Sequence, residues 1–202
     1  MSEVCLFFHF FITSKMSHVV LRSKLLVVGP STVGKTSLIK SFATDGGQFL
    51  PAYTMTLSAE LVTKAVTNEE HNTTVEFFMY DISGSSIYEY EYPDVFRDAN
   101  QIMVVFDVTR SETLKECGAW LDKVAKYAGK SLPGVLVGNK NDLSEFADVS
   151  IDDCKNFATE RALEYFDVSA KTYAGVVDPF NLLAERFIAL YENEVDTFIN
   201  AD

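Results

Sequence analysis

A glycine-rich stretch that contains a lysine and several hydroxyl residues carries the strongest chemical signal in the sequence. Residues 29–36 read GPSTVGKT, between an apolar run at 24–28 and a helix-periodic segment that begins at Thr36. In a loop between a strand and a helix, backbone N–H groups turn inward and, with the helix N-terminus, surround a polyphosphate. Lys35 would supply a point charge, and the Thr36 hydroxyl would ligate a magnesium ion shared with the phosphates. The expected phosphate contacts are Gly29, Ser31, Thr32, Val33, Gly34, Lys35, Thr36 and Ser37.

A carboxylate and a glycine end a second apolar run, at residues 75–80. Asp81 comes directly after this predicted strand and could hold magnesium through a water molecule. The backbone N–H of Gly84, three residues further on, could reach a γ-phosphate. Both groups would face the phosphates if the strand lies beside the one that precedes the glycine-rich loop.

Two short motifs near the C-terminal end of the chain could recognise a base. Residues 139–142 read NKND after the buried run 134–138, and residues 169–171 read SAK after the run 165–168. The Asp142 carboxylate can accept two hydrogen bonds from the N1 and N2 edge of guanine, whereas adenine offers no such donor pair, so the motif selects GTP over ATP. The Ala170 N–H could donate to guanine O6. The expected base contacts are Asn139, Lys140, Asp142, Ser169, Ala170 and Lys171.

The order of the four motifs predicts the fold. Each short motif alone could be a turn, and the first could be a chance Gly-Lys-Thr. Four in this order, each at the carboxyl end of a predicted parallel strand, indicate the edge at which open α/β sheets bind ligands. We therefore predict an α/β fold with a doubly wound, mostly parallel six-stranded sheet. Strands are expected before the loop and at 60–66, 74–80, 101–108, 134–137 and 164–168, and helices at 111–130, 151–163 and from 177.

One compact domain is expected at residues 19–202, with an extended C-terminal helix, after an N-terminal extension at 1–18 that is expected to be disordered. The apolar stretch 5–12 is too short to span a bilayer. In the last helix, apolar residues up to Tyr191 are expected in the core, whereas Val195, Phe198 and Ile199 would be exposed unless a partner covers them.

The motifs resemble those of the Ras superfamily of small GTPases, a class of P-loop NTPases, and the resemblance extends from Val19 to the last helix. Thr56 lies where that family has a threonine that ligates magnesium when the γ-phosphate is present. Phe49 lies at the family's aromatic position against the guanine ring. The stretch 80–99 resembles the second switch of Rab proteins without gaps. The resemblance implies GTP and GDP as ligands and Mg²⁺ held by Thr36, Thr56 and Asp81.

Within the Rab-like proteins, the chain resembles the GTPase subunits of the intraflagellar transport B complex. The segments that carry this resemblance are 44–49, 53–56, 60–66 and 131–140. It implies a small β-sandwich subunit and other intraflagellar transport B proteins as partners. It also implies a place in the cilium or flagellum and its basal region. The odd number of cysteines separately suggests reduced thiols in the cytoplasm.

Two residues depart from the family pattern. The catalytic residues by resemblance are Lys35, Gly84 and the residue after that glycine, normally a glutamine that orients the attacking water. Here it is Ser85, whose side chain is too short, so hydrolysis is expected to be slower than that of glutamine-bearing relatives. Thr32 replaces a usual glycine, and a β-branched residue there is expected to avoid positive φ and to loosen the phosphate grip.

Charge and cysteine content exclude some partners. A formal net charge of −12 argues against non-specific binding to nucleic acid or to anionic membrane surfaces. The three cysteines, Cys5, Cys117 and Cys154, have no metal-ligand or redox spacing. No cysteine follows Cys154, so no lipid anchor is expected at the C-terminus.

Two further function classes compete with a nucleotide-switched transport subunit. A Rab that regulates vesicle trafficking is disfavoured by the expected absence of a lipid anchor. A nucleotide-independent scaffold is disfavoured by the intact Lys35, Thr36, Asp81 and Asp142.

Overall fold

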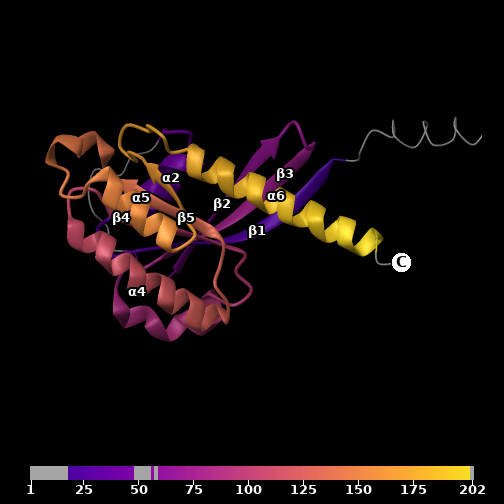
Figure 1. Ribbon diagram of the computed structural model, residues 1–202, viewed down its shortest axis with the longest axis horizontal. Helices are drawn as coiled ribbons and strands as arrows, with labels where there is room; N and C mark the ends of the chain where they lie inside the picture. Colours follow the sequence, from indigo (N-terminus) through magenta and orange to yellow (C-terminus); the bar gives the residue numbers. More distant parts are fainter. Residues whose placement is uncertain (1–17, 48–55, 57–58, 201–202) are drawn as a thin grey trace, which may run out of the picture.

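The computed structural model describes residues 18–47, 56 and 59–200 (Figure 1). A six-stranded sheet with the order β2-β3-β1-β4-β5-β6 forms its centre, and only the β2–β3 pair is antiparallel. This arrangement confirms the predicted doubly wound, mostly parallel sheet. The strands are β1 Val19–Val28, β2 Ala59–Asn68, β3 Thr73–Ile82, β4 Gln101–Asp107, β5 Gly134–Asn139 and β6 Glu164–Asp167.

Helices cover both faces of the sheet (Figure 1). One layer contains α2 and α6, and the opposite layer contains α3, α4 and α5. Two 3₁₀ segments, η1 and η2, follow β3 and β5, and the sequence analysis did not predict them. The bounds are α2 Lys35–Ala43, η1 Ser86–Glu91, α3 Tyr92–Val95, α4 Ser111–Ala128, η2 Asn141–Phe146, α5 Ile151–Glu160 and α6 Asp178–Ile199.

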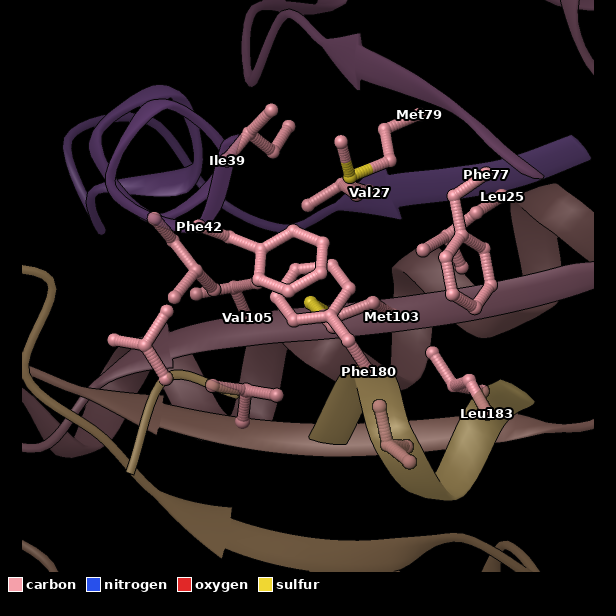
Figure 2. Packing of buried hydrophobic residues seen from close by; sticks show 14 of the residues in the cluster. Leu25, Val27, Ile39, Phe42, Phe77, Met79, Met103, Val105, Phe180 and Leu183 are labelled. Carbon is pink, nitrogen blue, oxygen red and sulfur yellow. The ribbon is translucent and has the colours of Figure 1, made fainter. Parts of the chain in front are cut away.

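Alternation along the central strands produces two cores. In β1, Leu25 and Val27 face the α2 and α6 layer, whereas Leu26 and Val28 face the α4 layer. Successive side chains of a strand point to opposite faces, so a strand covered on both sides is a continuous apolar run. Figure 2 shows the first core, where the rings of Phe42 from α2 and Phe180 from α6 stack with centroids 3.6 Å apart. This packing fixes α2, the helix that follows the glycine-rich loop, against the sheet.

Helix ends differ from the sequence expectation for local reasons. The α4 helix ends at Ala128, because Gly129 adopts a left-handed φ of 73°. The α5 helix ends at Glu160, and Ala162, with φ 55°, turns the chain toward β6. Helix geometry cannot continue through a left-handed residue.

The last helix leaves the core earlier than expected. Leu190 and Tyr191 were predicted to be core residues, but their exposed fractions are 48% and 40%. The prediction was wrong because Ile188 is the last residue of α6 in the buried core, although the helix and its apolar periodicity continue toward the C-terminus (Figure 1). Phe198 is 77% exposed. Within the described residues, no helix combines the length and apolarity needed to cross a membrane.

Candidate nucleotide-binding site

The glycine-rich loop joins β1 to α2, with Lys35, Thr36 and Ser37 in the first turn of the helix. Gly34 precedes that turn with φ 97° and ψ 26°, a left-handed conformation. A Cβ atom on Gly34 would lie 2.4 Å from Nδ2 of Asn139, so both the backbone angle and the close approach require glycine. The loop is thus packed against the NKND motif. The Val33 side chain is fully buried in the core, which leaves only its backbone for a ligand.

The Lys35 side chain is folded back into the loop. Its Nζ donates hydrogen bonds to the carbonyl oxygens of Gly29 and Pro30, each at 2.8 Å. Burial lowers the pKa of Lys35 from 10.5 to about 8, even though Asp81 acts in the opposite direction. The ammonium therefore lies in the concave loop, in surroundings that favour an added anion.

Three oxygen-bearing side chains meet next to Lys35. The Thr36 hydroxyl donates to Oδ2 of Asp81 at 2.5 Å and lies 2.9 Å from the Thr56 hydroxyl. Thr56 Oγ1 also donates to Asp81 Oδ2, at 3.3 Å. The sequence named these three residues as the magnesium ligands, and the structure brings them together.

The carboxylate of Asp81 fits a divalent cation. Its Oδ1 is buried and accepts no hydrogen bond from any described residue. Burial raises the pKa of Asp81, partly offset by the hydrogen bond from Thr36 and the charge of Lys35. A buried carboxylate oxygen without a donor is costly, and two hydroxyls and a carboxylate are the oxygen ligands that Mg²⁺ prefers. The donor set therefore suits magnesium.

Gly84 lies directly against the glycine-rich loop. A Cβ atom there would be 2.5 Å from the backbone nitrogen of Ser31, so only glycine fits. Its predicted contact with a γ-phosphate stays a prediction. The Ser85 hydroxyl accepts the backbone N–H of Ile87 at 3.4 Å and caps η1. The Ser85 side chain is therefore engaged in capping η1.

Asn139 joins the phosphate loop to the loop that follows β6. Its Nδ2 donates to the carbonyl of Val33 at 2.9 Å, and its Oδ1 accepts the Ala170 backbone N–H at 3.1 Å. Asn139 is almost completely buried. In this structure the Ala170 N–H bonds to Asn139, and its predicted bond to guanine O6 stays a prediction.

The two base-recognition motifs meet at their side chains. Oδ1 of Asp142 accepts a hydrogen bond from the Ser169 hydroxyl at 2.6 Å, and its Oδ2 lies 3.5 Å from Nζ of Lys171. The carboxylate predicted to read guanine is thus oriented by residues of the SAK motif. Phe49 lies outside the described residues.

The expectation for Thr32 was wrong. Its φ is 65°, within the positive range that it was expected to avoid. Lys140 donates to the Thr32 carbonyl at 3.1 Å, and Arg110 donates to the Thr32 hydroxyl at 3.1 Å. These tertiary contacts override the local preference.

The sequence analysis missed Asp107 and Arg110. Asp107 is 1% exposed and accepts hydrogen bonds from Lys140 at 2.6 Å and from Arg110 at 3.0 Å. Burial raises the pKa of Asp107, but hydrogen bonds from Lys140 and Thr109 outweigh it and leave the pKa below its usual range. Its position at the end of a parallel strand, like that of the other motifs, was an available signal.

Comparisons with known proteins agree with this site. The model of the Ras family matches residues 24–189. Intraflagellar transport protein 27 homolog of Mus musculus is 36% identical over 181 residues, which cover 89% of this chain and 97% of the relative. Intraflagellar transport protein 27 of Chlamydomonas reinhardtii is 36% identical over 186 residues, or 90% and 91%. Ras-related protein RABD2b of Arabidopsis thaliana is 32% identical over 157 residues, or 78% and 76%. A family match of this extent, together with the phosphate loop and the oxygen cluster beside it, means that the chain belongs to the Ras family.

Proposed function

We propose that this protein is a Rab-like GTPase of intraflagellar transport that binds GTP or GDP with Mg²⁺ and hydrolyses GTP slowly. The observation that carries the nucleotide assignment is the meeting of Thr36, Thr56 and Asp81 beside the buried ammonium of Lys35. Hydroxyl and carboxylate oxygens next to a cation and a row of backbone N–H groups suit a magnesium-bound polyphosphate.

The chain's own residues would divide the work in the following way. Lys35 and the loop N–H groups bind and orient the phosphates, and Thr36, Thr56 and Asp81 hold the ion, which neutralises phosphate charge when it is bound. Asp142, oriented by Ser169, accepts hydrogen bonds from the guanine edge. Because Thr56 belongs to the segment between α2 and β2, its contact with the ion would couple that segment to the presence of a γ-phosphate.

Slow hydrolysis follows from Ser85. A serine hydroxyl is too short to orient water at the γ-phosphate, and here it already caps η1. Even with the usual glutamine, intrinsic turnover in this class is on the order of 10⁻⁴ per second. We therefore propose that GTP persists once bound, so that the protein acts as a long-lived switch.

The transport assignment in this proposal rests on relatives, and the ciliary location and the partners rest on the family resemblance. Two of the three relatives described above are named for intraflagellar transport, and they match nearly all of this chain. We propose the cilium or flagellum and its base as the location, and a β-sandwich subunit and other intraflagellar transport B proteins as partners. The similarity to a Ras-related plant protein keeps regulation of vesicle trafficking as the second candidate.

Calorimetry tests nucleotide binding. Purified protein with Mg²⁺ should bind GTP and GDP and reject ATP. Asp142→Asn should lose guanine and gain xanthine nucleotides, since an amide can donate where xanthine accepts. Equal affinity for ATP and GTP in the unmodified protein would refute the base assignment.

Affinity capture from ciliated cells, followed by mass spectrometry, tests the cellular assignment. Recovery of intraflagellar transport B proteins is expected. Recovery of vesicle-trafficking factors in their place would favour the second candidate. Asp142→Asn should reduce this recovery if it depends on bound guanine nucleotide, because the substitution changes nucleotide choice.

A further inference from the structure

Thr32 holds a backbone conformation that its side chain disfavours. Its φ of 65° lies in the left-handed region, where a β-branched residue is an outlier that persists only under restraint from its surroundings. Left-handed residues matter in a phosphate loop, because their alternation with right-handed ones turns successive N–H groups toward one concave side. The shape of the loop therefore depends on what holds Thr32.

Two cations restrain Thr32, one at its backbone and one at its side chain. Lys140 Nζ donates to the Thr32 carbonyl at 3.1 Å. Arg110 Nη2 donates to the Thr32 hydroxyl at 3.1 Å and lies 3.5 Å from the carbonyl oxygen of Ser31. Lys140 belongs to the base-recognition motif, but Arg110 comes from the turn before α4 and has no role in the proposed mechanism.

Arg110 is itself fixed in place. Its Nε donates to Oδ2 of the buried Asp107 at 3.0 Å, and that carboxylate also accepts two hydrogen bonds from Thr109. The guanidinium is planar, so a bond from Nε to Asp107 sets the direction in which Nη2 points. The side chain thus links the end of β4 to the phosphate loop with defined geometry.

We propose that Arg110 is a positioning residue for nucleotide binding: by holding the Thr32 side chain, it keeps the phosphate loop in the left-handed conformation that presents its N–H groups to the phosphates. The proposal rests on the proposed function as a guanine-nucleotide-binding protein. Arg110 is needed because residue 32 is a threonine; a glycine at position 32 would adopt positive φ without restraint.

A double-mutant cycle separates positioning from other effects of the arginine. Release of a fluorescent GDP analogue would be timed by stopped flow, at fixed Mg²⁺, for the unmodified protein, Arg110→Ala, Thr32→Gly and the double variant. Loss of a partly exposed, charged hydrogen bond should speed release about three- to tenfold. In the Thr32→Gly background, the same arginine change should alter release by less than about twofold.

The control is Arg22→Ala, which removes an exposed arginine that pairs with Glu76 away from the proposed site, and it should leave release unchanged. If Arg110→Ala melts below the assay temperature, Arg110→Lys replaces it and should also speed release, because one ammonium cannot reach both Asp107 and Thr32 with fixed geometry.

The possible failures are distinguishable. Unchanged release in Arg110→Ala would overturn the positioning role and leave nucleotide binding intact. Equal acceleration in both backgrounds would also overturn it, since the arginine would then act through its charge and not through Thr32. An unmodified protein that retains no guanine nucleotide would refute the proposed function together with the inference.

Discussion

Raising the pH from 7 to 9 should weaken the binding of GDP to this protein, because the ammonium predicted to meet the phosphates is buried. Burial lowers the pKa of Lys35 to about 8. A phosphate beside the ammonium favours its charged form and should return the pKa to the ordinary lysine range. Binding must therefore add a proton to Lys35 whenever the pH exceeds its free-state pKa.

The magnitude follows from the two pKa values. With a free-state pKa near 8 and a bound-state pKa near 10.5, binding takes up about 0.1 proton at pH 7 and about 0.9 at pH 9. The dissociation constant should rise about tenfold over that range, equivalent to about 1.4 kcal/mol. The same lowered pKa affects stability. Between about pH 8 and 10.5 the Lys35 side chain is protonated in the unfolded chain but largely neutral in the folded protein, so its contribution raises the free energy of unfolding as the pH rises through this range.

Isothermal titration calorimetry in two buffers of different ionisation enthalpy counts the protons taken up. Above pH 8 the terminal phosphate of GDP is fully ionised, since its second pKa is about 6. Burial raises the pKa of both Cys117 and Cys154, so these thiols stay protonated and contribute little. Lys35→Met, studied at higher protein concentration, should lose the uptake. Tight binding with an uptake below about 0.2 proton at pH 9 would refute the argument from burial.

Two further substitutions test the site's geometry. Ser85→Gln should raise single-turnover GTP hydrolysis about tenfold or more, because it supplies a side chain that can orient water. Hydrolysis by the unmodified protein as fast as that of a glutamine-bearing Rab would show that another group orients the water. Gly34→Ala should destabilise the fold by about 1–3 kcal/mol in urea denaturation and also weaken GDP binding, because the methyl group would displace Asn139 from its close contact with the loop. Gly129→Ala is the matched control, with φ 73° but no atom within 4 Å of the added carbon, and it should lose stability without losing nucleotide.

Local sequence was sufficient for the six strands, the longer helices and most of the oxygen and cation donors. Residues 25–28, which precede the phosphate loop, are all apolar because this part of β1 is covered on both faces, and this pattern predicts a central parallel strand. Parallel strands bring their carboxyl ends to one edge, so Lys35, Asp81 and Asp142 could be expected to share a site without knowledge of any distance.

Long-range contacts decided the rest. The β-branched side chain of Thr32 predicted that this residue would avoid positive φ, but hydrogen bonds from Arg110 and Lys140, distant in sequence, hold it there. Asn139 was predicted to contact the base, and in the structure its side chain also links the phosphate loop to the loop that follows β6. Such links are set by which strand ends become neighbours, and spacing along the chain does not encode that.

The last helix illustrates the same limit. Its apolar period continues to Ile199, so the sequence indicated correctly that α6 would be long and amphipathic. Periodicity cannot reveal where the supporting sheet ends, and the exposure of Leu190 and Tyr191 was therefore missed. By itself the sequence determined the kinds of chemical groups at the site and their order along the chain. Only the tertiary structure decided which of these groups restrain one another, because burial and hydrogen bonding between distant segments outweigh the conformational preference of any single residue.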